Sequence, residues 1–192
     1  MNQISVFCGS SLGHDPQVIE VAEHVGKTFA EQGITLVYGA AKIGIMGRVA
    51  QSCLDHNGRV IGVIPEFLKL KEVVHLGLTQ VITTHSMHQR KQKMFDLSDA
   101  FIALPGGFGT LEELLEMLTW AQLGLHQKPI GVLNVNGYYD DLMKLSQTMN
   151  ERGFLKTENL DLLIYEDNIE TLIERMRRFE PQPVPKWLTA NS

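Results

Sequence analysis

The chain has 192 residues, which is enough for one substantial hydrophobic core and short for two domains. Its net charge of −5 provides no global basic field, so we expect no nucleic-acid partner. No apolar stretch approaches transmembrane length and the first residues lack a basic region, so we expect neither a membrane span nor a signal peptide. Two cysteines, Cys8 and Cys53, are too few for a disulfide framework, and reduced thiols in a cytoplasmic protein are the expectation.

Strand-like and helix-like patterns alternate along the whole chain. Strands are expected at residues 4–8, 34–38, 59–64, 79–83, 100–104, 130–134 and 162–165. Helices are expected at residues 17–32, 47–56, 87–97, 110–125, 140–150 and 168–179.

This alternation indicates parallel βαβ units with right-handed crossovers. The predicted fold class is therefore α/β, a three-layer sandwich of Rossmann type with a mostly parallel twisted sheet flanked by helices. Residues 1–180 are expected to form a single domain. Residues 181–192 contain three prolines and are expected to form an extended tail.

The segment PGGFGTLEE at residues 105–113 joins a predicted buried strand to a predicted helix. Gly106, Gly107 and Gly109 allow the backbone N–H groups of this turn to face a ligand, and the helix dipole adds partial positive charge there. An anion, above all a phosphate, fits such a turn. Glu113 lies within one helical turn of it, and a carboxylate beside a bound phosphate suggests chemistry on a phosphorylated substrate.

Glu113 also has a purely structural interpretation. Thr110 and Glu113 match a capping box, in which the threonine caps the helix and the glutamate reaches back to it. Leucines at 111, 114, 115, 118 and 125 are expected to face the core, which would leave Glu113, Met117 and Trp120 on the opposite side. A tryptophan there should be covered by substrate, by another segment or by a second subunit.

Two other strand ends carry glycine-rich turns. Gly9 and Ser10 follow the first strand and could contact a phosphate or a ribose, although taken alone they are better explained by a tight turn with a serine helix cap. A second segment runs from Gly39 to Gly47, but its spacing is not G-x-G-x-x-G. No acidic residue follows the second strand, where Val37 and Tyr38 stand, and this counts against a dinucleotide-dependent dehydrogenase.

The predicted helix at residues 87–97 carries the adjacent cations Arg90 and Lys91 between two apolar methionines. A cation pair beside the glycine-rich turn would hold a phosphate and orient Glu113. The alternative is a solvated basic helix, and we adopt it for Lys93. The histidines do not form a convincing metal triad, so no metal is expected. Neither a G-x-S-x-G elbow nor a P-loop sequence is present.

The segment PGGFGTLEE, preceded by MHQRKQKM at residues 87–94, resembles the paired signature of the Lonely Guy (LOG) family. Its members are phosphoribohydrolases of cytokinin riboside 5′-monophosphate and were long mislabelled lysine decarboxylases. The resemblance covers almost the whole chain and includes CGSS at 8–11, YGAAKIGIMG at 38–47 and VIPEFL at 63–68. One departure is Ala40, where the family usually has a third glycine.

The resemblance implies hydrolysis of the N-glycosidic bond of adenosine 5′-monophosphate, plain or N6-modified, to the free base (adenine or a cytokinin) and ribose 5-phosphate. Arg90 and Glu113 fall on the catalytic pair. Substrate-contacting positions are Glu72, Lys91, Gly106, Gly107, Gly109, Thr110 and Thr119. The resemblance further implies a homodimer, with the helix that bears Trp120 near the subunit contact, and no metal or organic cofactor.

Two alternatives remain at this stage. A non-catalytic nucleotide-binding or carrier protein could use the same turns, but binding alone needs no carboxylate beside a phosphate. A pyridoxal-phosphate decarboxylase is the weaker alternative, because nothing in the sequence marks a Schiff-base lysine.

Overall fold

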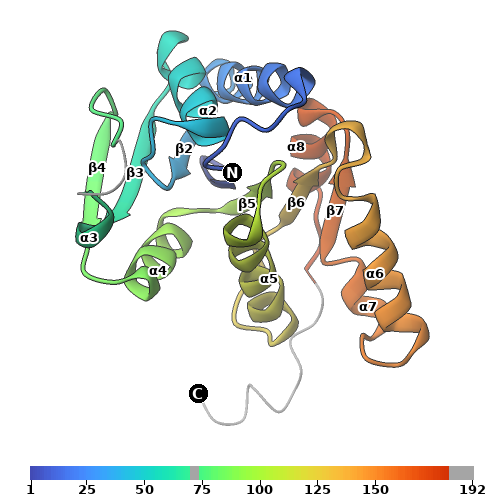
Figure 1. The fold of residues 1–192 in the computed structure, drawn as a ribbon. Helices are drawn as coiled ribbons and strands as arrows, with labels where there is room; N and C mark the ends of the chain where they lie inside the picture. Colours follow the sequence, from blue (N-terminus) through green and yellow to red (C-terminus); the bar gives the residue numbers. More distant parts are fainter. Residues whose placement is uncertain (70–73, 182–192) are drawn as a thin grey trace.

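Seven parallel strands form one sheet in the order β4-β3-β2-β1-β5-β6-β7, in a computed structural model that describes residues 1–69 and 74–181 (Figure 1). The sheet is entirely parallel, which confirms the predicted class. The strands are β1 (Gln3–Phe7), β2 (Thr35–Tyr38), β3 (Val60–Pro65), β4 (Gln80–Thr84), β5 (Ala100–Ala103), β6 (Ile130–Leu133) and β7 (Leu163–Glu166).

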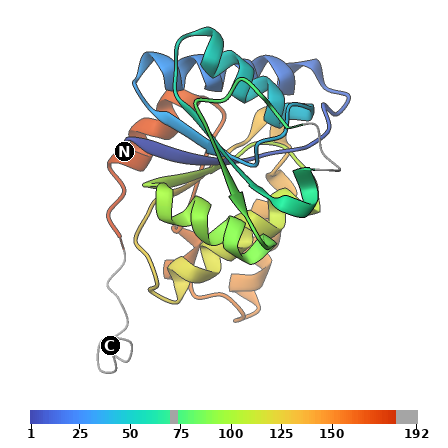
Figure 2. The same cartoon turned by 90° about the vertical axis from the view of Figure 1, so that its left-hand side faces the viewer.

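Helices cover both faces of the sheet (Figures 1 and 2). One face carries α1 (Pro16–Glu31), α2 (Gly44–Asp55) and α8 (Ile169–Arg177). The other face carries α4 (Met87–Leu97), α5 (Phe108–Gln122) and α6 (Asp140–Glu151). The short helices α3 (Glu66–Lys69) and α7 (Thr157–Leu160) and the 3-10 turn η1 (Val135–Gly137) were not expected from the sequence. Each face has its own buried apolar cluster, so the sheet is the middle of three layers.

The strand order reverses at β1. The chain builds outward from β1 through β2 and β3 to β4, and α4 then carries it back to β5 on the other side of β1. In such sheets ligands bind beyond the carboxyl ends of the strands at this switch point. Gly9 and Pro105, which follow β1 and β5, meet there, and the Gly9 N–H donates to the Pro105 carbonyl at 3.1 Å.

Two sequence predictions about α5 are wrong. The helix is capped by Gly107 and begins at Phe108, so Thr110 lies buried inside the first turn and the proposed capping box does not form. The expected leucine face is also incorrect, because Leu115 is 46% exposed while Met117 is buried. Leu114 and Leu115 are neighbours in sequence and point about 100° apart on a helix, so only one of them can face the sheet.

Trp120 is covered by another segment of the same chain. It is partly buried in the cluster on the α4–α5 face and contacts Phe95 of α4 edge-on, with ring centroids 5.1 Å apart. Of the three coverings considered from the sequence, the structure thus provides an intramolecular one.

The division into one domain and a tail stays a prediction, since residues 182–192 lie outside the described part of the chain. Within the described ranges, every helix is too short or too polar to cross a bilayer.

Two adjacent tyrosines support the turn between β5 and α5. The Tyr139 hydroxyl is buried and donates to the Leu104 carbonyl at 2.7 Å, while the half-exposed Tyr138 donates to the Gly106 carbonyl at 2.6 Å. These bonds join the segment after β6 to the segment after β5. They could not be predicted from local sequence patterns, because they link positions more than thirty residues apart.

We predict that Tyr139→Phe lowers the free energy of unfolding by about 1–3 kcal/mol, because it leaves a buried carbonyl without its donor. Tyr138→Phe is the matched control, since water can replace the lost donor at that half-exposed position. Urea denaturation of both variants measures the difference. Equal losses of unfolding free energy in the two variants would contradict the conclusion that burial makes the Tyr139 hydrogen bond the more important one.

Candidate active site

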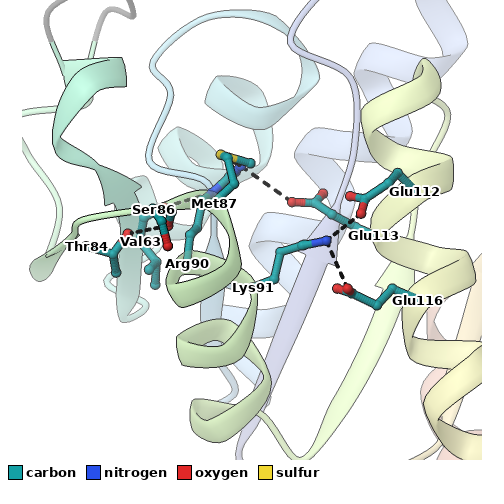
Figure 3. Close-up of polar contacts among 9 residues, drawn as sticks. All are labelled: Val63, Thr84, Ser86, Met87, Arg90, Lys91, Glu112, Glu113 and Glu116. Carbon is teal, nitrogen blue, oxygen red and sulfur yellow. Dashed lines mark hydrogen bonds and ion pairs between the residues drawn. The ribbon is translucent and has the colours of Figure 1, made fainter.

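Arg90 is a buried cation held between β3 and Gly39, the residue that follows β2. Its Nε donates to the Val63 carbonyl at 3.2 Å, and its Nη1 lies 3.9 Å from Met87 Sδ (Figure 3). The guanidinium rests against Gly39, where a Cβ would lie 2.1 Å from Arg90 Nη2. Position 39 therefore admits only glycine while the arginine keeps this place. The sequence marked Gly39 only as part of a glycine-rich turn.

Glu113 approaches this guanidinium from α5. Its side chain is 13% exposed, and its Oε1 lies 3.6 Å from Arg90 Nη1. This separation is an ion pair but too long for a hydrogen bond. The N–H groups of Arg90 and the carboxylate oxygens of Glu113 therefore stay able to hydrogen-bond a ligand.

The environment of Glu113 favours its neutral form. Burial raises the pKa of the Glu113 carboxyl from 4.5 to about 7, and Arg90 opposes this increase. Glu112 and Glu116 raise the same pKa further, while Lys91 lowers it. A carboxyl that titrates near neutral pH can exchange a proton during a reaction.

Cys8 lies at the carboxyl end of β1, close enough to Glu113 to sense its charge. Burial raises the pKa of the Cys8 thiol far above its usual range, and the Glu113 charge adds to the increase. The thiol is therefore neutral beside the carboxyl group.

Lys91, the neighbour of Arg90 on α4, points instead to α5. Its Nζ donates to Glu116 Oε1 at 2.9 Å and forms a second ion pair with Glu112 (Figure 3). Burial by itself would lower the Lys91 pKa, but the two hydrogen-bonded carboxylates raise it overall. The prediction of a substrate contact for Lys91 is not tested, but its ammonium already has two protein partners.

The glycine-rich turn packs tightly on one side and is open on the other. A Cβ at Gly106 would lie 2.1 Å from Thr110 Oγ1 and 2.8 Å from the Gly9 backbone nitrogen, so this turn fits closely against the end of β1. Gly107 and Gly109 are exposed, and nothing lies within 4 Å of a Cβ built on either. The N-terminus of α5 therefore presents free amide groups to an anion.

The first turn of α2 closes the other side of this region. A Cβ at Gly44 would lie 2.2 Å from the Ser10 carbonyl carbon, so the segment after β1 is held between α2 and the β5–α5 turn. Ser10 itself is exposed. The structure thus gathers Gly9, Gly106, Thr110, Arg90 and Glu113 at one edge of the sheet.

One predicted residue, Thr119, lies apart from this group. Thr119 is six positions beyond Glu113, roughly 9 Å along α5, and its hydroxyl donates to the Leu115 carbonyl at 2.7 Å. Glu72 lies outside the described residues.

Ala40, the departure from the family pattern, has a left-handed backbone conformation with φ of 68°. Such a conformation costs a non-glycine residue roughly 1–2 kcal/mol. The Ala40 carbonyl accepts a hydrogen bond from His75 N at 2.9 Å, which helps to hold the strained turn. The turn therefore forms without the third glycine.

Other features of the described chain do not join this site. A cavity of about 900 Å³ lies between the C-terminal end of α5 and the segment containing α7, and it contains none of the predicted site residues. Among residues 1–69 and 74–181, no group of three His, Cys, Asp or Glu side chains is placed to hold a metal ion.

A buried Arg–Glu pair beside an open helix N-terminus, at the switch point of a parallel sheet, defines an α/β protein with a candidate active site. The family model described as "Possible lysine decarboxylase" matches residues 46–176. The chain belongs to this family, which confirms the resemblance to LOG proteins seen in the sequence.

Curated relatives match over most of their length. Cytokinin riboside 5′-monophosphate phosphoribohydrolase LOG7 of Arabidopsis thaliana is 44% identical over 181 residues, which cover 94% of this chain and 83% of the relative. A probable cytokinin riboside 5′-monophosphate phosphoribohydrolase of Oryza sativa subsp. japonica, LOGL1, is 43% identical over 190 residues, covering 96% and 85%.

Solved structures share the fold at lower identity. The molybdenum cofactor binding protein of Rippkaea orientalis has a TM-score of 0.69 at 24% identity, covering 92% of this chain and 95% of that one. The Moco carrier protein of Chlamydomonas reinhardtii has a TM-score of 0.68 at 18% identity, with the same coverage.

We predict that ionised Glu113 destabilises the folded protein. Its pKa is near 4.5 when unfolded and about 7 when folded, so the folded state binds the proton more tightly and stability falls as the pH rises between these values. Relative to wild type, Glu113→Gln should therefore gain on the order of 3 kcal/mol of unfolding free energy between about pH 4 and pH 8.

Denaturation at a series of pH values measures this gain. Glu20→Gln, at an exposed position on α1, is the control and should show no comparable trend. A constant difference between Glu113→Gln and wild type would contradict the raised pKa.

Proposed function

We propose that this protein hydrolyses the N-glycosidic bond of adenosine 5′-monophosphate, plain or N6-modified, to the free base and ribose 5-phosphate. The printed activity of relatives more than 40% identical over nearly the whole chain supports the proposal. The observation that carries it is the Arg90–Glu113 pair, a buried carboxyl with a pKa near neutrality beside the open N-terminus of α5.

In this mechanism the substrate's phosphate binds the exposed amides of Gly107 and Gly109 at the first turn of α5, which also contains Thr110. Binding of the phosphate positions the ribose, so that binding energy remote from the reacting bond places C1′ at Glu113. Gly9 and Ser10 lie across the turn and would contact the phosphate or ribose. Glu72, Lys91, Gly106 and Thr119 stay predicted substrate contacts.

The bond between C1′ and the base nitrogen breaks, and its electron pair leaves with the base. The ribosyl group becomes cationic, and the Glu113 carboxylate stabilises that charge. A water oxygen then bonds to C1′ and gives a proton to Glu113. The departing nitrogen takes one proton from solvent and Glu113 returns one to solvent, so that one water is added overall. Arg90 orients Glu113 and neutralises it when no substrate is present.

The main alternative is a non-catalytic carrier; solved structures of this fold include one named a molybdenum cofactor binding protein and one named a Moco carrier protein. Those structures are at most 24% identical and therefore inform the fold alone. A carrier would also gain little from a buried carboxyl that disfavours phosphate and lowers stability when ionised. The Arg90–Glu113 pair thus favours the hydrolase.

The decisive experiment incubates the purified protein with AMP and with N6-prenylated AMP and follows free base and ribose 5-phosphate by chromatography. We expect base from the monophosphates and much less from adenosine, which lacks the 5′-phosphate. Glu113→Gln should lower turnover by about a hundredfold to ten-thousandfold while AMP still binds.

Two outcomes would count against the proposal. If wild type binds AMP but releases no base from any nucleoside monophosphate, the protein is a carrier. If Glu113→Gln keeps wild-type turnover, the glutamate has only a structural role in α5.

We propose that the protein is a homodimer and that α5 lies at the subunit contact. Phe108 is 93% exposed and Leu115 46% exposed on this helix, and Leu125 just beyond it is 59% exposed. Light scattering should give twice the chain mass, and Leu115→Glu should lower the measured mass toward that of the monomer.

We further propose a cytoplasmic location, consistent with the buried free thiols of Cys8 and Cys53.

A further inference from the structure

Three carboxylates stand close together near the start of α5. Glu113 faces Arg90, while Glu112 and Glu116 both face Lys91 (Figure 3). Like charges this close on a helix repel one another. Two cations of α4, Arg90 and Lys91, therefore pair with these three carboxylates, and Lys91 pairs with two of them.

The Lys91 ammonium is committed to α5. Its side chain is 11% exposed, and its two carboxylate partners are 55% and 22% exposed. Glu116 Oε2 is buried and has no hydrogen-bond partner among the described residues. Lys91 is thus the cation that compensates this carboxylate, and its loss would leave a partly buried charge unpaired.

We propose that Lys91 is a positioning residue that clamps α4 to α5 through Glu112 and Glu116 and thereby keeps Arg90 and Glu113 at their working separation. The inference rests on the proposed hydrolase function and deepens it, because it gives Lys91 a role in the reaction that requires no contact with substrate. The group formed by Lys91, Glu112 and Glu116 is called the α4–α5 clamp below.

The geometry makes the clamp effective because Arg90 and Lys91 are consecutive residues. On one side Arg90 is fixed to β3 through the Val63 carbonyl and is seated against Gly39. On the other side Lys91 is fixed to α5. The first turns of α4 are thus held from both directions, and a change in the spacing of α4 and α5 moves the Arg90–Glu113 pair directly.

The clamp also acts through charge. The groups that influence Glu113 are Arg90 and Lys91 from α4, and Glu112 and Glu116 from its own helix. Cys8, which directly follows β1, is neutral. Removal of Lys91 takes away one cation and leaves two anions, so the pKa of Glu113 rises. Removal of the two glutamates lowers it.

The test compares Lys91→Met, which keeps most of the side-chain stem, with the double variant Glu112→Gln/Glu116→Gln and with the triple variant. Lys93→Met is the matched control, on the same helix at a position for which the described residues show no ion pair. Steady-state kinetics with AMP are measured across pH. Lys91→Arg tests whether a different cation restores the clamp.

We expect kcat at its pH plateau to fall about tenfold or more in Lys91→Met, with KM changed less than about threefold. The double variant should show a similar loss, and the triple variant should be no worse than either, because all three remove one interaction. The acid limb of kcat should move to higher pH in Lys91→Met and to lower pH in the double variant. Lys91→Arg should recover part of the loss.

The opposite result identifies Lys91 as a substrate contact. In that case Lys91→Met would raise KM more than about tenfold at constant kcat, and the double glutamate variant would keep wild-type kinetics. Either finding would overturn the clamp.

A measurement without turnover separates this inference from the proposed function. In a double-mutant cycle, Lys91→Met and Glu116→Gln should change the free energy of unfolding non-additively, whether or not the protein cleaves nucleotides. Additive effects would overturn the clamp, while a wild type that releases no base would overturn only the proposed function.

Discussion

The burial of Glu113 beside Arg90 is the interaction around which the strand ends are arranged. The two residues come from consecutive helices on one face of the sheet, α4 and α5, and α4 is the crossover that returns the chain from edge strand β4 to β5. Both helices therefore begin at the carboxyl edge of the sheet. The reversal of strand order at β1 is what brings the cation and the carboxylate together there.

The site concentrates unfavourable features that the two apolar layers must outweigh. Glu113 resists ionisation because it is buried. Ala40 has a left-handed backbone conformation next to Gly39, against which the Arg90 guanidinium packs. Elsewhere, Phe29 and Phe101 are fully buried in the two apolar clusters. Strain of this kind gathers at functional positions and persists only where the surrounding fold determines it. The same edge of the sheet thus combines a strained backbone position with a carboxyl group whose pKa is raised to about 7.

Local patterns predicted the fold class and the glycine-rich turns of the candidate site, whereas long-range contacts could not be predicted from them. Alternating periodicities gave the strands and helices, and glycine-rich segments marked the ends of β1, β2 and β5. The start of α5 was misplaced because Thr110 imitates a cap, whereas Gly107 provides it. The partners of Lys91 lie more than twenty positions away and could not be inferred from composition or spacing.

The separation between Arg90 and Glu113 explains why other residues must hold the two side chains in alignment. A hydrogen-bonded pair would hold itself together at about 2.7–2.9 Å and would occupy the groups that a substrate needs. At 3.6 Å the pair keeps those groups accessible but contributes less to its own alignment. Alignment then has to come from Val63 on the strand side and from Lys91 on the helix side. An arginine suits the first place because its planar fork can bond a carbonyl and still face a carboxylate, and a compact ammonium suits the second because it can serve two carboxylates at once.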